Sequence, residues 1–313
     1  MSRSDVGTLI TKRMPSESQE FNIPVPYGHL AAKAWGDPAS ASNNVLALHG
    51  WRNNAGTFDN LAPLLSEDLY IVAVDLSGHG LSSHKPLGCS YNYIEYVMDV
   101  CRIVDILKWQ KFSIIGHSFG CCVGMMYASM YTNRVECIIA LDLYSPLHVQ
   151  DKNIARYTSE SIRKVLSIEE KLGFPPTYLE DELIDKLDAA TFGKLTESSK
   201  RTLLKRDLTP VGAGKVTLNP DPRTKIISTI HFNLSFQYAL MEHYTGDLLM
   251  VTASEIDPRI MRESMDAFFD LYSKKCRRFK HVEVEGNHFV HLNNAERVAP
   301  VVNAFLQEME YNS

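Results

Sequence analysis

Short apolar runs and amphipathic stretches alternate along the chain. Uninterrupted apolar runs are typical of strands that are covered on both faces of a parallel sheet. Such runs occupy residues 45–48, 71–74, 112–115, 135–143 and 248–252, and a last strand is expected at 281–285. Between them, apolar residues recur at helical spacing, at 57–65, 93–107 and 295–309. This pattern predicts an α/β fold, with helices packed on both faces of the sheet.

The N-terminal part departs from this pattern. Residues 21–35 predict two strands that break at the turn cluster Pro26–Gly28, forming an antiparallel hairpin. Residues 1–20 are polar and have no apolar core region, so we expect a flexible tail and not a secretory signal.

A long insertion separates two parts of the predicted core, residues 21–145 and 247–313. Residues 146–246 contain no clear buried strand. They contain helical stretches at 154–172, 178–187 and 236–244, and an irregular piece around 207–224. About a hundred residues of helix and loop between two strands predict an inserted helical cap, or lid, over the substrate.

The strongest chemical motif is Gly116-His117-Ser118-Phe119-Gly120, a Gly-x-Ser-x-Gly sequence. It follows an apolar strand and precedes a helix in which Gly120, Gly124 and Ala128 form a bare stripe. This is the strand–turn–helix context of a nucleophile elbow, which exposes the Ser118 hydroxyl above the sheet.

A second motif, His49-Gly50-Trp51-Arg52, follows the strand at 45–48. Attack by a serine on an ester builds negative charge on the carbonyl oxygen, and preorganised N–H donors must face it. We expect these donors to be the backbone N–H groups of Trp51 and Phe119. The predicted pocket wall comprises His49, Gly50, Trp51, His117 and Phe289.

A serine hydroxyl needs a base, and the base needs an acid that fixes its tautomer. His288 comes directly after the last strand, on a Gly-Asn loop, and is the preferred base. Its near neighbour His291 is expected to be structural. Asp257 is the preferred acid because it follows the strand at 248–252, and Asp142 and then Glu255 are the alternatives. The chain order Ser, acid, His is the one that this fold uses.

Two further polar residues follow the strand at 71–74. Asp75 and His79 lie in a Gly-rich loop, Leu76-Ser-Gly-His-Gly. We expect both to have structural roles, with Asp75 holding the loop by hydrogen bonds.

Composition narrows the function classes. The chain has 313 residues, of which 45% are hydrophobic, and a net charge of −5. The absence of a basic patch argues against nucleic acid as a partner, and no apolar run is long enough for a transmembrane segment. The six cysteines form no zinc spacing and are expected to be reduced, which favours a cytoplasmic location. We expect no metal and no cofactor, and the sequence leaves the oligomeric state open.

The motifs together resemble the α/β-hydrolase superfamily. The stretch from Leu48 to Leu65, with His288-Phe-Val-His-Leu292, is similar to the animal serine hydrolase-like proteins, the kraken group. This resemblance implies an eight-stranded, mostly parallel sheet with a helical cap. Epoxide hydrolases and haloalkane dehalogenases are similar in the same loops, but they have Asp at the position of Ser118.

These observations favour a serine hydrolase that cleaves carboxylic esters of small or apolar substrates through an acyl-enzyme. One alternative is a ligand-binding or receptor-like protein of the same fold that has little turnover. Another is a thioesterase or an amidase.

Overall fold

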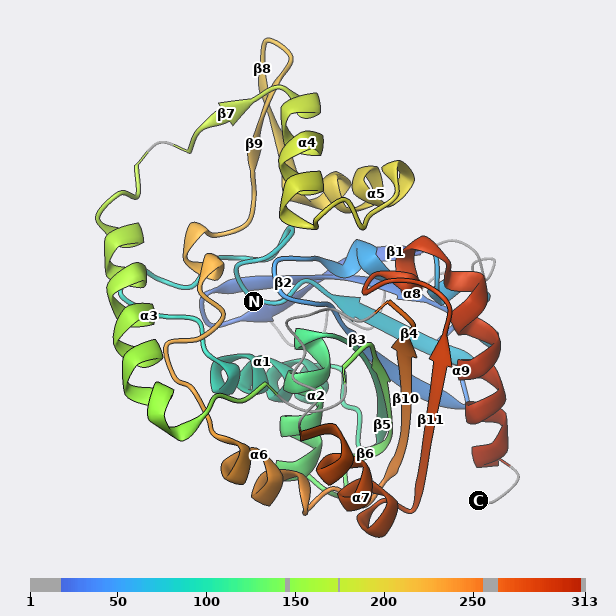
Figure 1. Ribbon diagram of the computed structural model, residues 1–313. Coiled ribbons are helices and arrows are strands. Elements are labelled where there is room, and N and C mark those ends of the chain that lie inside the picture. Colours follow the sequence, from blue (N-terminus) through green and yellow to red (C-terminus); the bar gives the residue numbers. More distant parts are fainter. Residues whose placement is uncertain (1–17, 144–146, 174, 256–263, 311–313) are drawn as a thin grey trace.

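The structure is a computed structural model that describes residues 18–143, 147–173, 175–255 and 264–310. A twisted central sheet carries helices on both faces, and a second group of elements lies above one edge of it (Figure 1). Of the predicted tail 1–20, most lies outside the described residues. Residues 19 and 20 belong to the first strand, which begins slightly earlier than predicted.

The central sheet has eight strands in the order β1-β2-β4-β3-β5-β6-β10-β11. The N-terminal strands β1 and β2 form the predicted antiparallel hairpin, and β2 is also antiparallel to β4. From β4 to β11 all neighbours are parallel. The strands are β1 (Gln19–Val25), β2 (Gly28–Trp35), β3 (Asn43–Leu48), β4 (Leu69–Val74), β5 (Phe112–His117), β6 (Val135–Leu141), β10 (Asp247–Ala253) and β11 (Arg278–Val284). The eight-stranded, mostly parallel sheet is therefore confirmed.

Helices cover both faces of this sheet because its strands are apolar on both sides. One face packs against α1 (Tyr93–Ile106), α2 (Phe119–Met130) and α7 (Met265–Lys275). The other face packs against α9 (Ala295–Glu310) and the short helices η2 (Ala55–Phe58) and η3 (Ala62–Leu64). The parallel strands all end at one edge, and the loops that follow them carry the chemical motifs.

The prediction of one amphipathic helix over 57–65 was wrong. The chain forms two 3₁₀ turns there, and Pro63 follows the first residue of the second turn. Proline lacks an N–H donor, so it fits the start of a helical turn and interrupts a continuous helix. The apolar side chains still face the core, which is why the periodicity looked helical.

The elements between β6 and β10 are α3 (Ile154–Glu169), α4 (Glu180–Ala190), α5 (Glu197–Asp207) and α6 (Leu234–Met241). A three-stranded sheet, β7-β9-β8, lies among them, formed by β7 (Thr177–Tyr178), β8 (Leu208–Gly212) and β9 (Lys215–Leu218). The irregular piece at 207–224 therefore contains a hairpin, whose turn glycines, Gly212 and Gly214, have positive φ. Leu183, Ile184, Leu204 and Val216 form a small apolar core of this segment. In Figure 1, α4, α5 and the hairpin lie above the sheet edge.

Within the described ranges, no helix combines the length and the apolar character needed to cross a membrane. All six cysteines lie in those ranges and are free thiols.

Candidate active site

Ser118 occupies a sharp turn between β5 and α2. Its backbone has φ 49° and ψ −113°, a conformation that is strained for a residue with a side chain. A Cβ on Gly116 would lie 2.6 Å from a backbone nitrogen of α2, and a Cβ on Gly120 would lie 2.0 Å from the Leu48 carbonyl oxygen. Only glycine fits at these two positions, so the motif's glycines permit the turn.

His288 and Asp142 meet at the same edge of the sheet. His288 follows β11, Asp142 follows β6, and both side chains are buried. The His288 Nδ1–H group donates to Asp142 Oδ2 at 2.5 Å. The other carboxylate oxygen of Asp142 accepts from the Ala253 N–H at 2.8 Å, which fixes the carboxylate plane. With Nδ1 engaged, the imidazole presents Nε2 as its remaining nitrogen.

Two of the three candidate acids, Asp142 and Glu255, lie in the described residues. Asp257, the preferred acid in the sequence, lies outside the described residues. Glu255 is exposed, and its backbone N–H donates to the Gly286 carbonyl oxygen at 2.8 Å. Within the described ranges, Asp142 is the only carboxylate that contacts the ring of His288.

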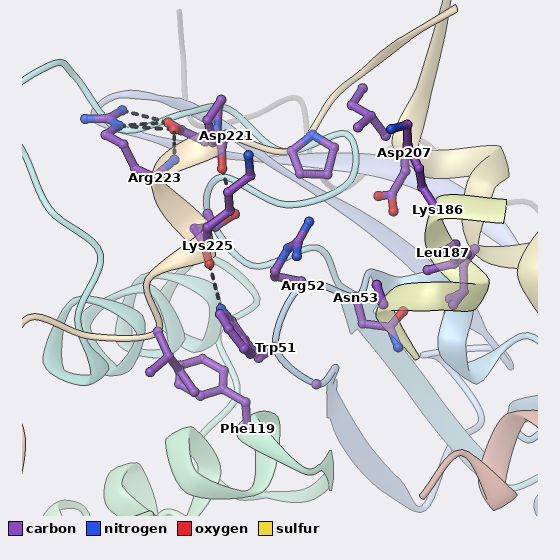
Figure 2. Close-up of a pocket in the computed structure, with 18 of the residues that line it drawn as sticks. Trp51, Arg52, Asn53, Phe119, Lys186, Leu187, Asp207, Asp221, Arg223 and Lys225 are labelled. Atoms are coloured by element: carbon purple, nitrogen blue, oxygen red, sulfur yellow. Dashed lines mark hydrogen bonds and ion pairs between the residues drawn. The ribbon is translucent and has the colours of Figure 1, made fainter. Parts of the chain in front are cut away.

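Ser118 and His288 line one cavity of about 1310 Å³, together with Phe119 and the predicted wall residues Gly50, Trp51, His117 and Phe289. Across the described part of the chain, no hydrogen bond joins the Ser118 hydroxyl to the His288 ring. Such contacts are often long without substrate and shorten in the complex. The cavity wall combines loops of the sheet edge with parts of the segment 147–246 (Figure 2).

His49 was predicted to lie in the pocket wall, and this was wrong. The side chain is fully buried behind the wall. Its Nδ1–H donates to the Gly50 carbonyl oxygen at 2.7 Å, and its Nε2 accepts from the Leu76 N–H at 2.9 Å. Burial lowers the pKa of His49 to about 4. The neutral His49 ring therefore joins the loop after β3 to the loop after β4.

The loop after β3 passes close to Ser118, since a Cβ on Gly50 would lie 3.5 Å from the Ser118 Cβ. The expected oxyanion donors are the backbone N–H groups of Trp51, in this loop, and of Phe119. Phe119 is the first residue of α2, so its N–H has no acceptor within the helix. Trp51 follows Gly50, whose carbonyl oxygen accepts from the Asn53 N–H at 3.1 Å and so tightens the loop. In the described residues, neither the Trp51 nor the Phe119 N–H has a hydrogen-bond acceptor.

Two buried histidines support His288, and sequence reasoning had assigned one of them to the pocket wall alone. The His117 Nε2–H donates to the His288 carbonyl oxygen at 2.8 Å, which joins the end of β5, directly before Ser118, to the loop that carries His288. The His117 ring lies 4.0 Å from the His291 ring, and His291 Nε2 contacts Thr57 Oγ1 at 2.7 Å. Burial lowers the pKa of His117 well below its usual value and that of His291 to about 3. The sequence signal that could have indicated this supporting role is the position of His117 directly before Ser118.

The segment 147–246 is held to the sheet edge by side chains of both parts. The Trp51 indole N–H donates to the Thr224 carbonyl oxygen at 2.6 Å (Figure 2). The Asn287 side chain, next to His288, donates to the Lys194 carbonyl oxygen at 2.9 Å. These bonds join the segment to the two loops that flank Ser118.

A buried ion pair adds a third connection. Arg206 of α5 donates to both oxygens of Asp75, at 2.9–3.1 Å, and Asp75 is fully buried. Asp75 also accepts from the Ala55 and Leu81 N–H groups at 2.7 and 2.8 Å. These contacts agree with the structural role expected for Asp75.

One carboxyl of the cavity wall was not predicted. Asp207, at the end of α5, accepts from the Asn54 side-chain amide at 2.9 Å. Burial raises the pKa of Asp207 to about 7. Its side chain is therefore only partly ionised at neutral pH.

No group of three or more His, Cys, Asp or Glu side chains in the described ranges has the arrangement of a metal site.

Comparison with known proteins gives the family. Residues 43–166 match the alpha/beta hydrolase fold family. The "Serine hydrolase-like protein" of Danio rerio is 36% identical over 304 residues, which cover 95% of this chain and 91% of that protein. The "Serine hydrolase-like protein 2" of Homo sapiens is 35% identical, with 94% of this chain and 95% of that protein covered. A solved hypothetical protein of Pseudomonas aeruginosa is 29% identical with a TM-score of 0.79, covering 92% of this chain and 99% of that one. The resemblance found in the motifs is thus confirmed, and the chain belongs to the α/β-hydrolase fold family, among the serine hydrolase-like proteins.

Proposed function

We propose that this hydrolase cleaves carboxylic esters, with Ser118 as nucleophile, His288 as base and Asp142 as the acid. The observation that supports the proposal best is the 2.5 Å contact between His288 Nδ1 and Asp142 Oδ2, beside a strained Ser118 in the same cavity. An acid in this place keeps a proton on Nδ1, which leaves Nε2 free to accept the serine proton.

The proposed reaction has two halves. Ser118 Oγ attacks the ester carbon while His288 Nε2 takes the hydroxyl proton, and the oxyanion accepts hydrogen bonds from the Trp51 and Phe119 N–H groups. The intermediate collapses to an acyl-serine, and His288 returns the proton to the leaving alcohol. In the second half, His288 deprotonates water, which attacks the acyl carbon. The intermediate then releases the carboxylic acid as His288 returns the proton to Ser118 Oγ.

Two other assignments belong to the proposal. Residues 146–246 act as a cap domain that covers a small-molecule ester, which fits their share of the cavity wall. The six free cysteines fit a reducing, cytoplasmic compartment.

The test is hydrolysis of p-nitrophenyl butyrate by wild type and Ser118→Ala. The variant should lose at least about 10³-fold in kcat, as expected when a nucleophile is removed, and should no longer bind a fluorophosphonate covalently. Ser129→Ala is the matched control, because Ser129 lies on α2 and its hydroxyl contacts Met241 Sδ, not the cavity. Full labelling and turnover in Ser118→Ala would refute the proposal. Labelled wild type without turnover of any ester would favour the receptor-like alternative.

A further inference from the structure

The cavity around Ser118 has an excess of positive charge, although the whole chain carries a net charge of −5. Its wall contains six basic side chains and only two carboxyl groups. The basic residues are Arg52, Lys85, Lys171, Lys186, Arg223 and Lys225, and the acidic residues are Asp207 and Asp221.

Two of these cations are already neutralised. Arg223 Nη2 contacts Asp221 Oδ2 at 2.7 Å, and Lys85 Nζ contacts Glu95 at 3.1 Å. The remaining cations have no ion pair with any acidic side chain of the described ranges; they are Arg52, Lys171, Lys186 and Lys225. They come from the loop after β3, the end of α3, α4 and the η5 turn (Pro222–Lys225), so four separate segments contribute to one wall.

Arg52 is the most constrained of the four. Its backbone has φ 56°, in the left-handed region that a long side chain rarely adopts. Strain of this kind persists when the surrounding structure holds it, and it occurs most often at functional sites. Figure 2 shows Arg52 rising from the loop into the pocket, between Lys225 and the pair Lys186 and Asp207.

Asp207 lies close enough to Arg52 for this positive charge to lower the pKa of the carboxyl, an effect smaller than that of burial. No ion pair joins the two side chains within the described residues, and Asp207 accepts a hydrogen bond from Asn54. Because burial raises the pKa of Asp207 to about 7, its charge is incomplete at neutral pH. The guanidinium therefore remains available to an anion from outside.

Other parts of the same wall are apolar. Leucine, isoleucine and phenylalanine side chains from the sheet edge and from the inserted segment line it, among them Phe119, Leu143, Leu147, Leu203 and Ile227. A cavity of about 1310 Å³ exceeds the roughly 300–1,000 Å³ of most small-molecule sites. It can hold a chain and a charged group at once.

We propose that the substrate is an acyl ester or thioester with a carboxylate or phosphate remote from the reacting carbonyl, held by Arg52, Lys186 and Lys225. The inference rests on the hydrolase proposed above and specifies its substrate class. Arg supplies a planar fork that binds carboxylate or phosphate with two hydrogen bonds, and lysines add point charges. The reacting carbonyl would lie beside Ser118, with the apolar wall around the acyl chain.

Two substrate pairs test this inference, each with the same reacting bond. The p-nitrophenyl monoester of glutaric acid is compared with p-nitrophenyl pentanoate, which places the anion on the acyl side. Butyryl-coenzyme A is compared with S-butyryl-N-acetylcysteamine, which places phosphates on the leaving group. Wild type should prefer the anionic member of at least one pair by about tenfold in kcat/KM, the effect of one hydrogen bond to a charged group.

The variants Arg52→Gln, Lys186→Gln and Lys225→Gln should reduce this preference, with the largest loss, about tenfold, in Arg52→Gln. Lys111→Gln is the matched control, since it makes the same charge change before β5, at the opposite edge of the sheet. It should leave the preference unchanged. Lys186→Gln separates anion binding from damage to the Trp51 loop, because Lys186 lies on α4, whereas Lys225 follows the Thr224 carbonyl that accepts from Trp51.

The inference would be overturned if wild type had equal kcat/KM values for the anionic and the neutral member of both pairs. It would also be overturned if all three variants kept the wild-type preference for the anionic member. Calorimetric titration with coenzyme A and with glutarate gives a readout without turnover, and Arg52→Gln should weaken the binding of whichever anion wild type binds. If neutral esters are hydrolysed but neither anion binds, only this inference fails. If an anion binds and neither an ester nor a thioester is hydrolysed, the proposed reaction fails and only the anion-binding site remains.

Discussion

Replacing Asp142 with asparagine tests the site most sharply. In wild type, Asp142 Oδ2 accepts the proton of His288 Nδ1 at 2.5 Å, and Oδ1 accepts from the Ala253 N–H at 2.8 Å. Asparagine can keep the second bond through its carbonyl oxygen, but it then presents an NH₂ group to Nδ1. The ring responds by carrying its proton on Nε2, the nitrogen that should accept the proton of Ser118.

The expected loss follows from this change of tautomer. In a Ser-His-Asp protease the same substitution lowers kcat by about 10⁴, which corresponds to about 5.4 kcal/mol of transition-state stabilisation. Stability should change far less, by about 1 kcal/mol, because the Ala253 bond is preserved and one neutral hydrogen bond is exchanged. Steady-state hydrolysis of p-nitrophenyl butyrate and urea unfolding of the same preparation measure the two quantities.

Asp257→Asn is the comparison variant, since Asp257 is the acid preferred from its place after the strand at 248–252. It should keep kcat within about twofold of wild type if Asp142 is the functional acid, a difference below about 0.5 kcal/mol. The reasoning is refuted if Asp257→Asn loses activity while Asp142→Asn retains it. An equal, small loss in both variants would mean that the carboxylate does not fix the tautomer.

Two further predictions concern stability. Arg206→Met should lower the free energy of unfolding by about 3 kcal/mol or more, because it leaves Asp75 buried without its counter-ion. The control Arg201→Met, at an exposed position of the same helix, should lower it by less than about 1 kcal/mol. Urea unfolding of both variants measures the two losses, and equal losses would contradict the prediction. Burial lowers the pKa of His291 to about 3 in the folded protein. Below about pH 6.5 the His291 side chain is therefore protonated in the unfolded chain but not in the folded one. This difference lowers the free energy of unfolding by about 1.4 kcal/mol for each pH unit. His291→Gln, which can still reach Thr57, should flatten the slope of unfolding free energy between pH 6 and pH 4 by that amount, and an unchanged slope would show that His291 does not contribute.

The motifs with local causes were predictable from the chain. The elbow at Ser118 was predictable because the Gly-x-Ser-x-Gly motif stands between an apolar strand and a helix, although the Leu48 carbonyl oxygen that leaves no room for a Cβ at Gly120 lies far away in the sequence. The buried strands were visible because a parallel sheet with two covered faces requires continuous apolar runs. His288 was identifiable because it directly follows the last strand.

Features that depend on distant contacts were harder to predict. The choice between Asp142 and Asp257 depends on which strand end approaches His288, and sequence order alone does not measure that distance. The burial of His49 depends on Leu76, and the tie from His117 to the His288 carbonyl oxygen spans 171 positions. The short sheet in the inserted segment pairs residues around 177 with residues around 216, and these strands have only two to five residues each.

The hydrogen bonds from Trp51 to Thr224 and from Asn287 to Lys194 have a consequence for substrate entry. A bulky ligand that displaces the inserted segment must break bonds made by the same loops that hold the reacting groups. In the proposed reaction, an oversized substrate would therefore shift the loops of Trp51 and His288, whereas a substrate that leaves these bonds intact meets both residues already in position. On this proposal, substrate size affects turnover as well as binding.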